Sequence, residues 1–179
     1  GKYSIYSKGH RNPQGLIYIE KEDVILTTSH GPKGGGEINK IIFNKNYGWP
    51  ISSYGTHYPN DPDKKTPFLK SHKDHGFIEP IHYFVPSVAP SQIIEINENF
   101  SSDWKNDYFM SSLTAAGRGY SLFRVRFSGT FNDVQEIERI YIGTRIRDII
   151  YEPTKNIYLL SLEGVHTKSL GIVSFIEDN

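Results

Sequence analysis

The sequence predicts an all-β protein, and three observations support this fold class. Residues that favour strands are plentiful among its 179 residues, including 12 Tyr and 10 Phe. Sixteen Gly and ten Pro supply turns. Apolar runs are short and bounded by turn residues, and no segment of helical length carries an apolar stripe with the roughly 3.6-residue period of a helix.

The strands can be placed in order along the chain from these runs. VQEIERIYI, which begins at residue 134, alternates well enough for an edge strand, although residues 130–140 could also hold a short helix. The stretch 53–79 is rich in Pro, Asp, Lys, His and Gly and predicts a long loop that projects from one face. The predicted strands are residues 15–20, 23–29, 37–43, 80–85, 91–97, 107–113, 120–127, 134–142, 147–152, 156–162 and 170–176.

An internal repeat predicts how these strands are grouped. DVILTTSHG at 23–31 and NIYLLSLEG at 156–164 align on their final glycines and share a turn residue, an apolar strand and a polar exit. A weaker copy, NDYFMSSL, occupies 106–113. The pattern predicts one domain, residues 1–179, that is a partial β-propeller of about three four-stranded blades. The alternative is a plain meander of antiparallel strands, which shows some similarity of this kind.

Composition excludes several classes of protein. Lys and Arg balance Asp and Glu at 20 each, which argues against a nucleic-acid binder that neutralises phosphates. No apolar run approaches the roughly 20 residues that span a bilayer, so no membrane insertion is expected. The chain has no cysteine, so disulfides and thiolate metal sites are excluded.

The motif RNPQG gathers polar side chains at a turn near the N-terminus. The proline fixes the local chain and the glycine releases it, so Arg11, Asn12 and Gln14 can face one point. Arginine offers a planar fork for a carboxylate, and the amides offer both donors and acceptors. The alternative is a polar turn that stabilises its own backbone.

A glycine-rich turn, HGPKGGGEIN, occupies residues 30–39. It is not a P-loop, because the Gly-Lys-Ser/Thr ending is missing. Glycines let backbone groups approach a ligand closely, so the turn is a candidate ligand site. The alternative is a flexible hairpin loop.

The motif TRIRD places Arg145 and Arg147 at alternate positions of a strand, so both share one face, whereas Asp148 points the other way. Two cations on one face repel unless an anion or a carboxylate lies between them. We therefore expect an anion site here, and the alternative is a pair of surface arginines on an edge strand.

Taken together, these motifs, with NYGWP at 46–50, make the chain resemble the soluble quinoprotein glucose/sorbosone dehydrogenase family. The resemblance covers nearly all of residues 9–176 and implies the C-terminal half of a six-bladed propeller. It implies that pyrroloquinoline quinone (PQQ), a cofactor with three carboxylates, is contacted by Arg11, Asn12, Gln14, Arg145 and Arg147. Ser87, in PSVAPS, would line the central channel against the flat quinone.

The resemblance also implies two calcium sites. The backbone carbonyls of Gly31 and Pro32 would bind the calcium that sits on the quinone, since calcium accepts backbone oxygens readily. A second, structural calcium would use the Glu37 side chain and the Tyr47 backbone. The alternative for these two residues is an ordinary acid at a strand edge and a core tyrosine.

The chain departs from the family pattern at three places. Thr114 stands where the family often has a lysine that faces the quinone, and Arg118 is the nearby residue that could reach back. Val85 stands where an aromatic often stacks on the cofactor, and Phe84 is the neighbour that could substitute. The histidine that takes the proton of the sugar hydroxyl in the family belongs to an earlier blade, and none of the seven histidines matches it.

The function that the resemblance implies is oxidation of aldose sugars at C1 to lactones, in a periplasmic or secreted protein. We expect the isolated chain to be inactive, because the blades that carry the base are not part of it. We also expect association, since a partial propeller leaves sheet edges exposed and could form a homo-oligomer through them. The alternative is a non-catalytic propeller that binds carbohydrate or protein partners.

Overall fold

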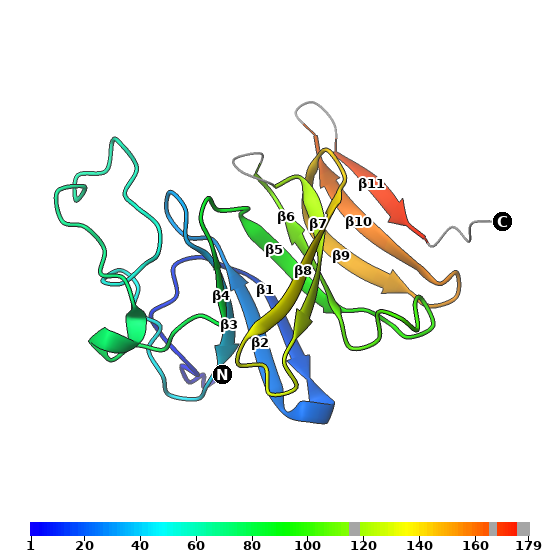
Figure 1. The fold of residues 1–179 in the computed structure, drawn as a ribbon, viewed down its shortest axis with the longest axis horizontal. Coiled ribbons are helices and arrows are strands. Elements are labelled where there is room, and N and C mark those ends of the chain that lie inside the picture. The colour runs from blue at the N-terminus through cyan, green and yellow to red at the C-terminus, as the bar shows by residue number, and fades with distance from the viewer. Residues whose placement is uncertain (115–118, 165–167, 175–179) are drawn as a thin grey trace.

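The computed structural model describes residues 1–114, 119–164 and 168–174, and within them the protein is all-β (Figure 1). Eleven strands form three antiparallel sheets, and the only helices in this part of the chain are two short 3-10 turns, η1 (Glu20–Glu22) and η2 (His72–His75). The first sheet contains β1 (Pro13–Ile19), β2 (Val24–Ser29), β3 (Gly36–Ile41) and β4 (His82–Phe84); the second contains β5 (Pro90–Glu95), β6 (Tyr108–Ser112), β7 (Ser121–Phe127) and β8 (Val134–Tyr141); the third contains β9 (Arg145–Glu152), β10 (Ile157–Glu163) and β11 (Lys168–Val173).

The three sheets are successive blades of a β-propeller. Within each sheet the strands follow one another in chain order, so each blade is a simple antiparallel meander. The first strands of the blades lie together, because β1 contacts β5 and β5 contacts β9. Figure 1 shows the sheets side by side, splayed around this inner row of strands. The prediction of a partial propeller with about three blades is therefore confirmed.

Each predicted strand range coincides with an observed strand, with small shifts at the ends. Residues 134–142 hold β8, which is the edge strand of the second sheet, and not a helix. The strand predicted at 147–152 begins earlier, at Arg145. The last predicted range, 170–176, ends beyond the residues that the structure describes.

Two apolar clusters hold the blades together, and β6 contributes to both. Tyr108 and Met110 of β6 face the first blade, where they pack with Leu26. Phe109, between them in sequence, faces the third blade and packs with Tyr158. Side chains of a strand alternate between its two faces, so a blade with neighbours on both sides needs apolar residues at successive positions.

The internal repeat is visible in the strand pairing. Ile17 pairs with Leu26 in the first blade, and the residues that the repeat aligns with them, Ile150 and Leu159, pair in the third. The turn before the second strand of every blade also repeats, because the residue there has a positive φ: Asp23, Asn106 and Asn156 at 52°, 66° and 55°. Asp and Asn tolerate this left-handed conformation better than other residues with a side chain.

A buried chain of hydroxyl groups links the three blades near their inner strands. The Thr28 hydroxyl of the first blade donates to the carbonyl of Ser91 in the second. The Ser91 hydroxyl accepts from Ser111, at 2.8 Å, and donates to the carbonyl of Ile146 in the third blade, at 2.6 Å. These bonds satisfy polar groups that packing of the inner strands removes from water.

The outer face of the third blade is apolar and uncovered. Ile150, Leu170 and Ile172 are exposed there, and Leu170 is 77% exposed. In the first blade the repeat aligns Ile150 with Ile17, which packs against the cluster shared with the second blade. The exposed face is therefore the one that the repeat uses to contact a following blade.

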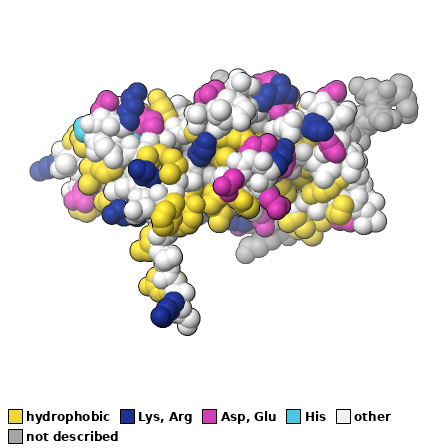
Figure 2. Space-filling model, turned by 90° about the horizontal axis from the view of Figure 1, so that it is seen from below, with side chains coloured by type: hydrophobic (Ala, Val, Ile, Leu, Met, Phe, Trp, Pro, Cys, Tyr) yellow, Lys and Arg dark blue, Asp and Glu magenta, His cyan; other side chains and the backbone are white. Residues whose placement is uncertain are grey.

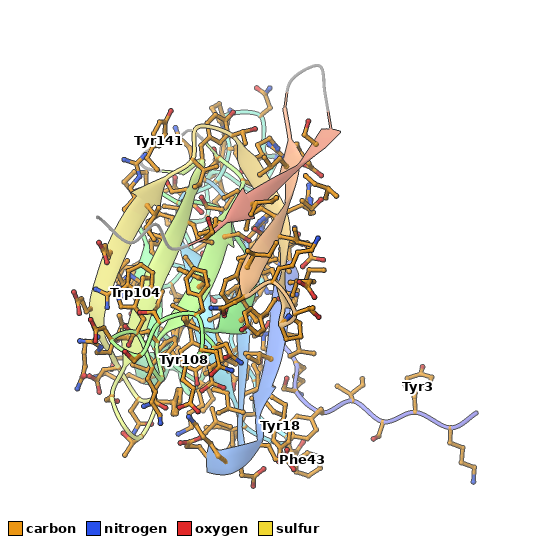
Figure 3. The ribbon with its side chains drawn as sticks, turned by 90° about the vertical axis from the view of Figure 1, so that its right-hand side faces the viewer. Tyr3, Tyr18, Phe43, Trp104, Tyr108 and Tyr141 are labelled. Atoms are coloured by element: carbon orange, nitrogen blue, oxygen red, sulfur yellow. The ribbon has the colours of Figure 1, made fainter. Side chains whose placement is uncertain are left out.

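The first blade has the complementary uncovered face. Leu16 and Tyr18 are exposed on it, and Tyr18 lies at the surface near the end of β1 (Figure 3). Their counterparts in the third blade, Ile149 and Tyr151, pack in the cluster between the second and third blades. This is the face that the repeat uses to contact a preceding blade.

Two segments extend from the blades. The chain between β3 and β4 forms a long excursion beside the first sheet (Figure 1), tied to the fold by isolated bridges such as Lys33 with Thr56. The first residues project from the body and leave Tyr3 exposed (Figure 3), and Figure 2 shows the same projection beside an apolar surface. Across the described ranges, no helix has the length and apolarity that crossing a membrane requires.

Candidate functional site

Two motifs that are distant in sequence meet at one end of the blades, the upper end in Figure 1. Gln14 is the second residue of β1 in the first blade, and Arg147 lies near the start of β9 in the third. The Arg147 Nη1 group donates to Oε1 of Gln14 at 3.2 Å, across a sequence separation of 133. The repeat aligns these two residues, so equivalent positions of two blades touch each other, and we call this end of the blades the rim.

Arg145 and Arg147 share one carboxylate at the rim. Glu163, the last residue of β10, accepts Nε of Arg145 at 3.3 Å. It also accepts Nε and Nη2 of Arg147 at 2.9 and 3.0 Å. The two guanidinium groups hold the pKa of Glu163 below its ordinary value, Arg147 being the stronger influence. The carboxylate that the sequence required between two cations is thus supplied by the neighbouring strand.

Arg11 and Asn12 lie beside this group. The Arg11 Nη1 group donates to the carbonyl of His30 at 3.2 Å, and its guanidinium lies 5.3 Å from the ring centre of Trp49. Its Nε atom is buried and makes no hydrogen bond within the described residues. The Asn12 side chain accepts from Nε2 of Gln14 at 2.9 Å. Asn12 and Gln14 therefore hold each other, whereas Arg11 is held by the backbone of His30 and keeps a buried Nε without a partner in the described residues.

His30 is placed among the arginines, and the sequence did not identify it. Burial lowers the pKa of its imidazole, and the positive charges of Arg147, Arg11 and Arg145 lower it further. Its Nε2 atom is buried and has no hydrogen-bond partner in the described residues. A neutral imidazole with a free nitrogen can donate to or accept from a ligand.

Ser87 lies beside the glycine turn. Its hydroxyl accepts the backbone N–H of Ala89 at 3.0 Å, and a side chain added at Gly36 would meet it at 2.6 Å. Val85 is exposed near Gly34, whereas Phe84 packs against the cluster between the first two blades. Whether Phe84 substitutes for the missing aromatic stays a prediction.

Thr114 ends the described segment that follows β6, and its backbone N–H donates to the carbonyl of Val88 at 3.4 Å. It therefore lies beside the start of β5, as expected for a residue near the rim. Arg118, which we expected to reach back toward the site, lies outside the described residues.

The glycine turn brings backbone oxygens together. A Cβ added at Gly31 would clash with the carbonyl oxygens of Gly35 and Gly34. Gly34 and Gly35 have φ of 89° and 65°, a conformation that favours glycine. The clashes at Gly31 and Gly35 and the positive φ at Gly34 and Gly35 therefore favour glycine in this turn.

The four predicted calcium ligands line one small cavity. Gly31, Pro32, Glu37 and Tyr47 line a cavity of about 10 Å³, which is near the lower limit for one water or ion. The Tyr47 ring is itself fixed, because its hydroxyl donates to the carbonyl of Lys40 at 2.6 Å. The structure therefore joins what the sequence treated as two separate sites.

Glu37 is a largely buried acid in this cavity. Burial raises its pKa to about 7, the Asn39 amide that donates to it at 3.1 Å opposes the rise, and the charge of Glu79 adds to it. The described residues contain no salt bridge to Glu37. A buried carboxylate without a counter-charge favours either a proton or a bound cation.

Comparison with known proteins agrees with the motifs. The sequence pattern of the glucose/sorbosone dehydrogenase family matches residues 1–166. The chain is 32% identical over 162 residues to an aldose sugar dehydrogenase of Escherichia coli, covering 89% of this chain and 41% of the relative. It is 26% identical over 207 residues to quinoprotein glucose dehydrogenase B of Acinetobacter calcoaceticus, covering 88% and 42%.

The fold agrees as well. The crystal structure of the soluble aldose sugar dehydrogenase of Escherichia coli in its apo form superposes with a TM-score of 0.77 at 26% identity, over 96% of this chain and 47% of that one. The chain thus spans less than half the length of the relatives that it matches.

Proposed function

Because the chain belongs to the glucose/sorbosone dehydrogenase family, we propose that it is the C-terminal part of a quinoprotein that oxidises aldoses at C1 to lactones with PQQ and calcium. One observation carries this proposal. The contact between Arg147 and Gln14 brings together, at one rim, the two motifs that we propose to bind the cofactor, although they are far apart in sequence.

The chemistry of the rim suits an anionic, planar cofactor. Arg145 and Arg147 offer guanidinium forks for carboxylates, and Asn12 and Gln14 offer amide donors beside them. Arg11 Nε and His30 Nε2 are buried polar atoms without partners in the described structure, so a ligand could satisfy both. These side chains would bind and orient PQQ, with Ser87 lining the channel nearby.

Calcium would be held in the cavity of the glycine turn. Gly31 and Pro32 would contribute backbone oxygens, Glu37 a carboxylate and Tyr47 a backbone oxygen, which are ligand types that calcium accepts. A cation there would also neutralise the buried acid. The pre-formed turn, which only glycine can adopt at Gly34 and Gly35, would keep the cost of ordering these ligands low.

In the reaction, PQQ when bound would accept the hydride from C1 of the sugar. The residues of this chain would hold the cofactor in place and supply positive charge where negative charge develops. The proton acceptor for the sugar hydroxyl would come from the other part of the whole protein. We therefore propose that this chain alone binds cofactor but does not oxidise sugar.

We also propose that the two uncovered faces associate. The face with Leu170 and Ile172 and the face with Leu16 and Tyr18 correspond to the two sides of a blade-to-blade contact. β11 is in addition an edge strand of the third sheet in the described residues. Two copies could pair third blade to first blade twice and close a ring of six blades, which would bury both faces.

Titration of the chain with PQQ, with and without calcium, tests the proposed function. Saturable, calcium-dependent change in PQQ absorbance is expected, and Arg145→Ala/Arg147→Ala should abolish it. The control, Lys105→Ala/Lys155→Ala, removes two positive charges from the opposite end of the blades and should bind as the wild type does. Equal binding by both double variants, or none by the wild type at millimolar PQQ, would contradict the proposal.

A further inference from the structure

Glu163 binds both arginines of the pair. Its two oxygens accept three N–H groups, one from Arg145 and two from Arg147. The Arg147 Nε and Nη2 groups form the fork that would clasp a carboxylate in two parallel bonds, and both already bind Glu163. The third nitrogen of the same guanidinium, Nη1, binds Gln14.

The blade architecture does not require an acid at this position. Glu163 pairs with Arg145 across the strands, and the corresponding pair in the first blade is Asn12 with His30, whose backbones are also hydrogen-bonded. The first blade thus folds with an imidazole where the third has a carboxylate. The acid therefore serves the arginines and not the strand pairing.

An incoming carboxylate must compete with Glu163. The Glu163 side chain is 28% exposed and those of Arg145 and Arg147 are 42% and 41% exposed, so solvent and ligands can reach all three. The Glu163 carboxylate is tethered beside the arginines, so its effective concentration there is of the order of millimolar. A free ligand with a single carboxylate competes with it only at a similar concentration. A ligand with several carboxylates has further partners at the rim, such as Arg11, and so can displace it.

We infer that Glu163 is an internal competitor that occupies the arginine pair until a polycarboxylate displaces it, and that it thereby sets the affinity of the rim and its preference for polycarboxylates over monocarboxylates. The identification of that polycarboxylate as PQQ rests on the proposed function. The competition itself rests only on the contacts of Arg145 and Arg147.

The test compares wild type with Glu163→Gln, which keeps the shape of the side chain and removes its charge. Calorimetric titration with benzene-1,3,5-tricarboxylate and with acetate in metal-free buffer, and with PQQ in buffer that contains calcium, gives the affinities. Glu163→Gln should bind the tricarboxylate about tenfold more tightly, equivalent to about 1.4 kcal/mol. It should also gain measurable acetate binding, because the competitor is gone.

Glu138→Gln is the matched control, because Glu138 accepts Arg124 Nε at 2.7 Å on the second blade and is likewise an arginine-paired strand residue. It should bind as the wild type does. Circular dichroism establishes that each variant folds. If Glu163→Gln does not fold, Glu163→Asp, whose shorter side chain cannot reach both arginines equally well, should show a smaller gain of about two- to threefold.

Equal or weaker tricarboxylate binding by the folded Glu163 variant would overturn the inference, since Glu163 would then be a positioning residue for the arginines. Absence of tricarboxylate binding in every variant would overturn it as well. A tenfold gain for the tricarboxylate without any PQQ binding would support the competition and refute the cofactor. PQQ binding in the presence of calcium that is unchanged by the variant would leave the proposed function standing and refute the competition.

Discussion

Replacing Glu37 by glutamine should remove a loss of stability that the folded chain suffers as pH rises. Burial raises the pKa of Glu37 from 4.5 to about 7. The folded state then binds more protons than the unfolded state between these two values. The free energy of unfolding contributed by this residue is therefore highest below pH 4.5, falls as pH rises to about 7, and stays constant above it.

The size of the effect follows from the pKa difference. A difference of about 2.5 corresponds to about 3 kcal/mol, since each pKa unit is about 1.4 kcal/mol. Glutamine keeps the carbonyl oxygen that accepts from Asn39 and lacks the charge. The stability of Glu37→Gln should therefore depend less on pH than that of the wild type. The free energy of unfolding of the variant minus that of the wild type should be larger at pH 8 than at pH 5, by up to about 3 kcal/mol.

Urea denaturation in metal-free buffer at pH 5, 6, 7 and 8 measures this difference. Buried histidines also titrate in that range: burial lowers the pKa of His10, His30, His72 and His82, so their contribution to stability rises with pH. They are common to both proteins and cancel in the difference. A difference between wild type and Glu37→Gln that stays constant from pH 5 to pH 8 would refute the reasoning.

Calcium should reverse the effect in the wild type. At pH 8 a cation beside Glu37 compensates its charge, and a calcium concentration about 100 times the dissociation constant would add about 2.7 kcal/mol. The glutamine variant should gain much less. Equal stabilisation of both proteins by calcium would show that the metal binds elsewhere.

Three further predictions concern the contacts between blades. The buried Tyr158 hydroxyl bonds two backbone groups of the second blade, so Tyr158→Phe should lower the free energy of unfolding in urea by about 2 kcal/mol. Removal of the exposed hydroxyl of Tyr151 should lower it by less than about 0.5 kcal/mol. Equal losses would contradict a link between the blades through Tyr158. Thr28→Val should cost about 1–3 kcal/mol because it removes the bond to Ser91, and an unchanged urea midpoint would count against that role. Wild type should scatter light as a dimer and Leu170→Asp as a monomer, and a monomeric wild type would disprove the association.

Much of the fold was predictable because its determinants are local. Short apolar runs and turn residues define the strands, and the internal repeat grouped them into blades. The same repeat makes Gln14 and Arg147 equivalent, which predicts that both lie at the start of inner strands. Their direct contact follows from the packing of three blades and could not be predicted from either motif.

The rest of the site depends on contacts between residues that are distant in sequence, which the motifs alone do not predict. The need for a carboxylate between Arg145 and Arg147 was clear, but its identity depends on the register of β9 with β10, which selects Glu163. The burial of His30 among three arginines depends on loops from two blades. The packing of Phe84 against the cluster between the first two blades depends on the short strand β4, whose faces could not be assigned from so few residues.

The Gln14–Arg147 contact shows that the chemistry of the rim is divided between equivalent positions of two blades. Equivalent positions of the first and third blades lie together at the rim, so a ligand bound there would contact the same structural position in both blades. In the first blade these equivalent positions hold amides and an imidazole, and in the third blade they hold two guanidinium groups and a carboxylate. Substitutions at these positions of one blade can therefore change its charge without disturbing the strand pairing of another blade. Ligand specificity can thus change one blade at a time while the fold stays the same.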